Sequence, residues 1–83
     1  MLYMIELHYS PEHREAALRY FLDHGATHYE GNVKLQNGWV ATKDCVAYVL
    51  ARGNSDEGVD KACVPLREFG EVYYRHVTST DEI

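Results

Sequence analysis

Long apolar runs, cysteine and basic residues are all scarce in this 83-residue chain. No segment approaches the roughly 18 consecutive apolar residues that a membrane-spanning helix needs. Glu6 and His8 interrupt the apolar start, and no basic cluster precedes it, which does not fit a signal peptide. We therefore expect a cytoplasmic protein that has no membrane partner.

The only two cysteines, Cys45 and Cys63, are far apart and form no CxxC motif. A disulfide framework or a structural zinc site would need more ligands at tighter spacing. The five histidines are scattered, and His8 and His76 are expected near opposite ends of one sheet. We therefore expect reduced, buried thiols, no metal and no cofactor.

Acidic residues outnumber basic ones by 13 to 8, which gives a formal net charge of −5. Nucleic-acid binding draws most of its affinity from basic side chains that neutralise phosphates. The charge balance therefore argues against a nucleic-acid partner.

What the chain does contain is alternation. Residues 2–9 alternate between apolar and mixed positions, which predicts a strand with one buried face. Ser10-Pro11-Glu12 then begins a helix over residues 11–24, followed by a polar connection at residues 26–31. The residues of this helix that should face inward are Arg14, Ala17, Leu18, Phe21 and Leu22, which recur at helical spacing.

Residues 32–42 read as a strand that contains Asn37-Gly38. This dipeptide is a strong hairpin signal. The flanking segments would be very short, however, so we prefer a glycine-centred bulge within one strand and a turn at residues 42–44. Whether it is a bulge or a turn decides where Trp39 points, and the sequence leaves that open.

Residues 45–52 form an apolar run typical of a strand buried on both faces. Ser55 caps a second helix, which Pro65 should break or kink. Residues 71–78 are the last strand, and we expect residues 79–83 to fray.

The order of elements is β-α-β-β-α-β, which predicts a single α+β domain over residues 1–83. The architecture is ferredoxin-like: a four-stranded antiparallel sheet with two helices on one face. We expect the first and third strands to be central and parallel, with the last strand beside the first.

Tyr3, Ile5 and Leu7 should face the helices, which leaves Met4, Glu6 and His8 on the open side of the sheet. On the third strand, the open side should hold Val46, Tyr48, Leu50 and Arg52. The last strand is ambiguous, but burying Arg75 under helices is costly. We therefore place Glu71, Tyr73, Arg75 and Val77 on the open side, where Arg75 can pair with Glu6.

An open face this apolar normally marks an interaction surface. The simplest partner is a second copy of the chain, packed sheet on sheet. The sequence thus predicts a homodimer.

Three stretches resemble one known family: Leu2-Tyr3-Met4, Arg14-Glu15-Ala16-Ala17, and Gly31-Asn32-Val33-Lys34-Leu35 through Gly38-Trp39. The family is domain-of-unknown-function family 3303, in the dimeric α/β-barrel group. The resemblance implies a dimer of ferredoxin-like units, a dimeric α/β barrel, with no assigned activity.

The candidate ligand-binding or interface residues gather on the open face: Glu6, His8, Trp39, Tyr48, Tyr73 and Arg75. In one interpretation Glu6 and Arg75 form an interface ion pair in a non-catalytic or small-molecule-binding domain. In the other, His8 is the general base of a cofactor-independent monooxygenase- or isomerase-like enzyme that acts on a small organic molecule in the dimer cavity. Whether the chain is an enzyme stays open.

The RNA-recognition module shares this order of elements. Its third-strand motif opens with a basic residue, a glycine and an aromatic residue. Asp44-Cys45-Val46 supplies none of these, and facing Tyr3 outward would bury Glu6 without a partner. We therefore expect no RNA partner.

Overall fold

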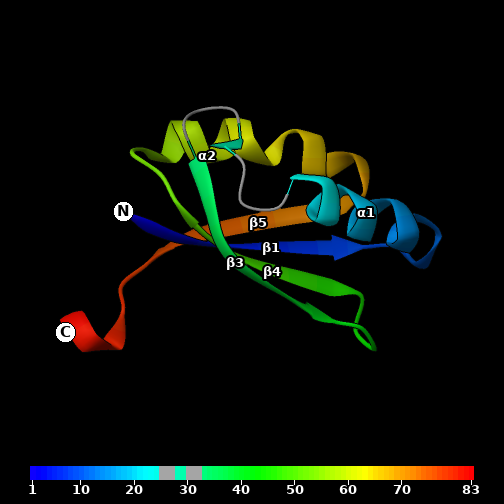
Figure 1. Ribbon diagram of the computed structural model, residues 1–83, viewed down its shortest axis with the longest axis horizontal. Coiled ribbons are helices and arrows are strands. Elements are labelled where there is room, and N and C mark those ends of the chain that lie inside the picture. Colours follow the sequence, from blue (N-terminus) through cyan, green and yellow to red (C-terminus); the bar gives the residue numbers. More distant parts are fainter. Residues whose placement is uncertain (25–27, 30–32) are drawn as a thin grey trace.

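The protein is described by a computed structural model that covers residues 1–24, 28–29 and 33–83. Both helices lie on one face of an antiparallel sheet (Figure 1). The long strands are β1 (Leu2–Tyr9), β3 (Val33–Ala41), β4 (Val46–Arg52) and β5 (Gly70–Val77). The helices are α1 (Arg14–His24) and α2 (Asp56–Cys63). The short elements are η1 (Pro11–His13), β2 (His28–Tyr29), η2 (Pro65–Glu68) and η3 (Thr80–Glu82).

The strand order is β2-β3-β4-β1-β5, so the four long strands have the predicted ferredoxin-like arrangement. The two-residue β2 adds a short edge beside β3. It lies within the connection expected at residues 26–31, whose other residues are outside the described part of the chain. The predicted fold class is confirmed.

One detail of the prediction is wrong: β1 and β4 are central neighbours but run antiparallel. The crossover through α1 makes β1 and β3 run in the same direction. The hairpin that follows then reverses the chain, so β4 opposes β1.

The two faces of the sheet are divided as predicted. Tyr3, Ile5 and Leu7 are buried beneath the helices, and Tyr74 packs against the same core. The pairing register places Glu6 opposite Tyr48 and Tyr73, which puts all three on the other face. The predicted orientation of the last strand is thereby confirmed.

The stripe expected on the first helix is only partly buried. Ala17 is fully buried and Phe21 packs against the core, whereas Arg14 is exposed and Leu22 is 83% exposed. Helical periodicity identifies the apolar side of a helix, but it does not say how closely each turn approaches the sheet. At its C-terminal end, α1 leaves apolar side chains uncovered.

The second helix begins where the sequence predicts, and of the two predicted effects of Pro65, a break or a kink, the structure shows the break. The Ser55 hydroxyl accepts a hydrogen bond from the Gly58 amide at 3.1 Å, which caps α2. Val64 is the C-cap residue of α2, and Pro65 after it begins the 3-10 turn η2. The proline therefore ends the α-helix, as its missing amide requires.

A bulge is present in β3 as the sequence predicts, but it is not centred on Gly38. Leu35 pairs with Ala51 and Asn37 pairs with Leu50, so Gln36 is the extra residue. One extra residue exchanges the two faces for everything that follows. Trp39 therefore lies opposite Tyr48 on the open face, whereas Gly38 and Val40 lie on the helix side.

Candidate functional site

The open face consists of cross-strand rows, and the central row contains four of the candidate residues. Across β3, β4, β1 and β5 it reads Trp39, Tyr48, Glu6 and Tyr73. The neighbouring rows contain Ala41, Val46, His8 and Glu71 on one side and Asn37, Leu50, Met4 and Arg75 on the other. The structure thus brings all six candidate residues onto one surface.

Glu6 contacts two basic side chains on this surface. Its Oε2 lies 3.5 Å from Nη2 of Arg75, and its Oε1 lies 3.5 Å from Nε2 of His8. The Glu6 side chain is 21% exposed, so most of it is covered by neighbouring groups. The predicted Glu6–Arg75 ion pair is confirmed, and His8 is a second partner of the same carboxylate.

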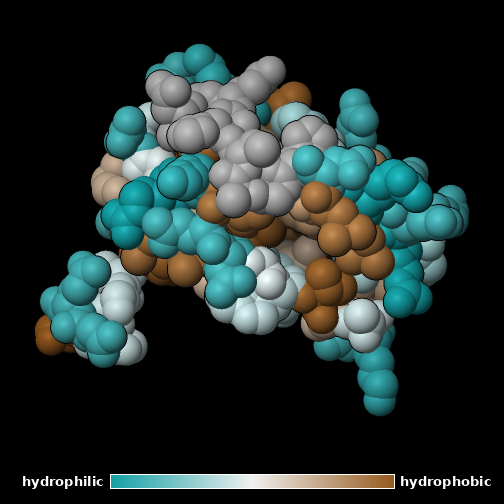
Figure 2. Space-filling view, viewed as in Figure 1, coloured by the Kyte–Doolittle hydropathy of each residue, from teal (hydrophilic) through white to brown (hydrophobic). Residues whose placement is uncertain are grey.

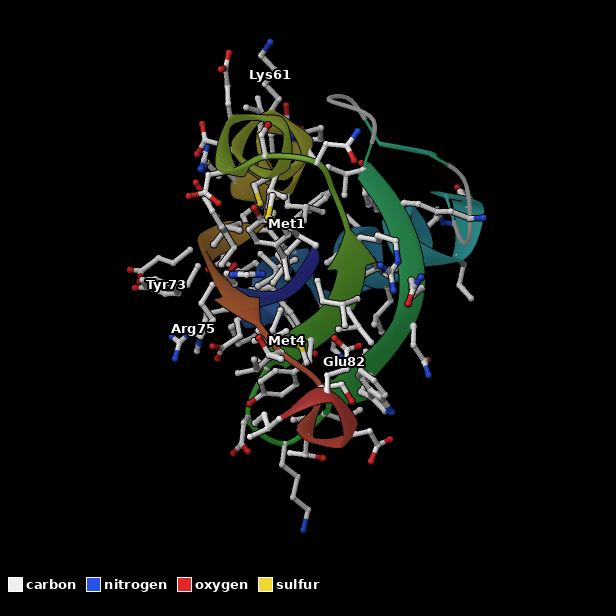
Figure 3. All side chains as sticks on the ribbon, turned by 90° about the vertical axis from the view of Figure 1, so that its left-hand side faces the viewer. Met1, Met4, Lys61, Tyr73, Arg75 and Glu82 are labelled. Atoms are coloured by element: carbon white, nitrogen blue, oxygen red, sulfur yellow. The ribbon has the colours of Figure 1, made fainter. Side chains whose placement is uncertain are left out.

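Tyr73 contacts the other side of the His8 ring. The ring of Tyr73 meets the ring of His8 edge to face, with centroids 5.4 Å apart. The Tyr73 hydroxyl donates to the Glu71 carboxylate, and this hydrogen bond raises the pKa of Tyr73. His8 therefore lies between a carboxylate and an aromatic edge, in contact with solvent. Figure 3 shows Tyr73 and Arg75 projecting from β5 at the outer margin of the sheet, with Met4 on its underside.

An apolar recess lies on the other face of the sheet, between α1 and strands β3 and β4. Its volume is about 380 Å³. Its lining residues are Leu18, Phe21, Leu22, Leu35, Gly38, Trp39, Val40, Ala47, Tyr48 and Val49. In Figure 2 apolar atoms surround a hollow on this side of the molecule. His8 and Glu6 are not among its lining residues, so the recess is distinct from the ion cluster.

Sequence reasoning missed this recess because it treated the stripe of the first helix as filled core. The signal was present in Gly38, which has no side chain, and in Ala47, which has a small one. Both lie on the helix side of the sheet opposite α1. Trp39 and Tyr48 are also among the lining residues of the recess, although the register places their side chains on the open face.

The described histidines and cysteines belong to no group of three or more potential metal ligands. His8 on β1 and His76 on β5 lie on opposite faces of the sheet and near opposite ends of the β1–β5 pair. Cys45 and Cys63 are free thiols. Burial raises the pKa of Cys63 to about 11, which keeps that thiol protonated and inert near neutral pH.

A second polar contact that the sequence did not reveal joins β1 to the start of α2. The buried Tyr3 hydroxyl donates to Oδ1 of Asp56 at 2.6 Å. That hydrogen bond, together with burial, raises the pKa of Tyr3 to about 12. It ties the helix layer to the central strand and is structural.

Within the described residues, no helix is both long and apolar enough to span a membrane. Comparison with curated proteins and with solved structures finds no match for this chain. The model of one family, described as Domain of unknown function (DUF3303), matches residues 1–83. The whole chain therefore belongs to this family of unknown function.

Proposed function

We propose that this protein acts as a homodimer in which two chains pack sheet against sheet through their open faces. The observation that carries the proposal is the central row of that face. Its two ends, Trp39 and Tyr73, are 50% and 48% exposed. Large aromatic side chains at such exposure are typical of interface anchors. In this proposal Glu6, His8 and Arg75 form a polar cluster within the interface.

At the β3 edge, the sheet is poorly suited to pairing with a strand of another chain. The bulge at Gln36 interrupts the regular hydrogen-bonding edge of β3. Next to it, the Asn37 side chain accepts a hydrogen bond from the Gly38 amide at 2.8 Å, which occupies a donor that a partner strand would need. Bulges and occupied donors are common protections against edge association.

The charges on the open face favour one relative orientation of the two chains. One end of the face carries Glu71, and the other end carries Arg75, Arg52 and Lys34. A two-fold axis in the plane between the sheets and perpendicular to the strands reverses the strands of the partner. The acidic end of one chain then meets the basic end of the other, which complementary interfaces require.

The C-terminal segment supplies further contact area. With about 3.3 Å per residue and about 4.8 Å between strands, four strands present a flat face of about 500 Å². A stable interface needs about 800 Å² from each partner. Residues 78–83 leave the end of β5 and lie on the side of the sheet away from the helices (Figures 1 and 3). They carry Ile83, which is almost fully exposed in a single chain.

The test is sedimentation of charge variants. We expect the wild-type protein to be dimeric and both Arg75→Glu and Glu71→Arg to weaken the dimer by at least about tenfold. An equimolar mixture of the two variants should restore dimers, because every contact between unlike chains then joins opposite charges. Lys61→Glu, on the outer surface of α2, is the matched control and should leave association unchanged. Wild-type protein that stays monomeric at high concentration would overturn the proposal, as would a mixture that associates no better than its components.

A second candidate function is a cofactor-independent enzyme, of monooxygenase or isomerase type, that acts on a small organic molecule in the dimer cavity. The observation in its favour is the contact between His8 and Glu6, because a carboxylate beside an imidazole orients it as a base. A thermal-shift screen with small phenols and β-diketones tests it, since a histidine can remove their acidic protons. A compound that stabilises the wild type but not a dimeric His8→Ala variant supports this function. Equal stabilisation of both proteins opposes it.

A further inference from the structure

We propose that the recess between α1 and strands β3 and β4 is a binding site for an uncharged, mostly apolar organic molecule of roughly two to three fused rings. Its volume of about 380 Å³ is within the range of small-molecule sites, about 300 to 1,000 Å³. The site lies on the helix side of the sheet. The inference therefore goes beyond the proposed dimer and does not depend on it.

The recess runs from the surface into the core. Its floor contains Ala47 and Val49, which are almost completely buried, and its rim contains Leu22 and Val40, which are exposed. A flat apolar patch would have exposed residues throughout. This gradient from rim to floor suits a compact molecule that enters between helix and sheet, and it does not suit the broad convex surface of a partner protein.

The composition of the lining determines the class of ligand. Among the described residues that line the recess, none carries a charge. Trp39 and Tyr48 are the only ones with a polar side-chain atom, and the register places both side chains on the open face. A charged group inside it would lose its hydration without gaining a partner, which costs several kcal/mol. Neutral aromatic or alicyclic molecules lose little hydration on entry and gain contacts with Leu18, Phe21 and Leu35.

The chain contains its own reporter for this site. Trp39 is the single tryptophan of the sequence and contacts the recess. A bound molecule that absorbs in the range of indole emission should therefore receive energy from Trp39. Phenyl-naphthylamine is a neutral probe of this kind, and anilinonaphthalene sulfonate carries a sulfonate on the same aromatic skeleton.

The experiment titrates both probes into wild-type protein and into three variants. We expect phenyl-naphthylamine to saturate at one per chain with energy transfer from Trp39, and the sulfonate to bind at least about tenfold more weakly. Leu22→Asp places a carboxylate at the exposed rim without disturbing the core, and it should weaken phenyl-naphthylamine binding by at least about tenfold. Leu18→Asp, deeper in the recess, should abolish binding. Val64→Asp makes the same exchange at an exposed apolar residue outside the recess and should change nothing.

Absence of saturable phenyl-naphthylamine binding overturns the inference. So does unchanged binding to Leu22→Asp, or a sulfonate that binds as tightly as the neutral probe. Sedimentation of the same samples separates this result from the fate of the dimer. A monomeric protein that binds the probe contradicts the proposed function alone, and a dimer that does not bind it contradicts the site alone.

Discussion

The Tyr9 hydroxyl offers a direct test of how hydrogen bonding stabilises this small core. Tyr9 is 3% exposed, and its hydroxyl finds no hydrogen-bond partner among the described residues. Its ring packs with Leu7, Ala17 and Ala47 beneath the helices. A buried hydroxyl without a partner costs about 1–3 kcal/mol in lost hydration. Tyr9→Phe keeps the ring and removes that cost.

We therefore expect Tyr9→Phe to stabilise the protein by about 1 kcal/mol or more. For a domain of this length, 1 kcal/mol corresponds to a rise in Tm of about 4–8 °C. Urea unfolding at fixed protein concentration measures the change, and the slope m should stay the same because the surface exposed on unfolding does not change. Tyr9 lies on the helix side, so association through the open face contributes equally to both proteins.

Tyr3→Phe is the matched control, because it removes the same atom from the same face of the same strand. The Tyr3 hydroxyl donates to Asp56, so its removal leaves a carboxylate without its donor and should destabilise the protein. The two substitutions should have opposite signs. If Tyr9→Phe destabilises the protein as Tyr3→Phe does, the Tyr9 hydroxyl has a partner and the reasoning is refuted.

Three further predictions concern backbone geometry and pH. Cys45 has a φ of 55°, which is a left-handed backbone conformation. This conformation costs a residue with a side chain about 1 kcal/mol or more relative to glycine. In urea unfolding, Cys45→Gly should therefore be more stable than Cys45→Ala by about 1 kcal/mol. A Cβ on Gly70 would lie 2.0 Å from the His8 carbonyl oxygen. Gly70→Ala should therefore separate β5 from β1 and lower the free energy of unfolding by about 3 kcal/mol or more. A variant of near-normal stability would contradict the pairing of these two strands. The raised pKa of Tyr3, about 12 against about 10 when unfolded, means that the folded chain retains a proton that the unfolded chain loses. Its contribution is complete below pH 10 and is lost as the pH rises towards 12, so Tyr3→Phe should show a smaller alkaline loss of stability than the wild type.

The sequence was informative wherever a local pattern had one physical solution. The alternation in residues 2–9 has one buried side, and that side contains Tyr3, Ile5 and Leu7 in the structure. Pro65 has no amide to donate, and α2 ends before it. The orientation of the last strand was predicted correctly from the cost of burying Arg75. Under the helices its guanidinium would lose its hydration, whereas on the open face it pairs with Glu6.

The sequence failed where the answer depended on contacts between distant segments. Helical periodicity placed Leu22 on the inner side of α1, but the distance between that turn and the sheet is set by how the two layers pack. The hydrogen bond from Tyr3 to Asp56 joins residues that are 53 positions apart in the sequence, and no local pattern predicts it. The relative direction of β1 and β4 depends on two connections: the crossover through α1 keeps the direction of the chain, and the following hairpin reverses it.

The bulge at Gln36 connects the two surfaces on which both proposals rest. Without that extra residue Trp39 would lie opposite Ala47 and point into the space between α1 and the sheet, where an indole would fill the recess. With it, Trp39 joins Tyr48 and Glu6 on the open face, and Gly38 and Val40 take the positions beneath the helix. One inserted residue thus leaves a hollow on one side of the sheet and adds an aromatic anchor to the other. The recess and the aromatic row are therefore two consequences of the same local backbone irregularity.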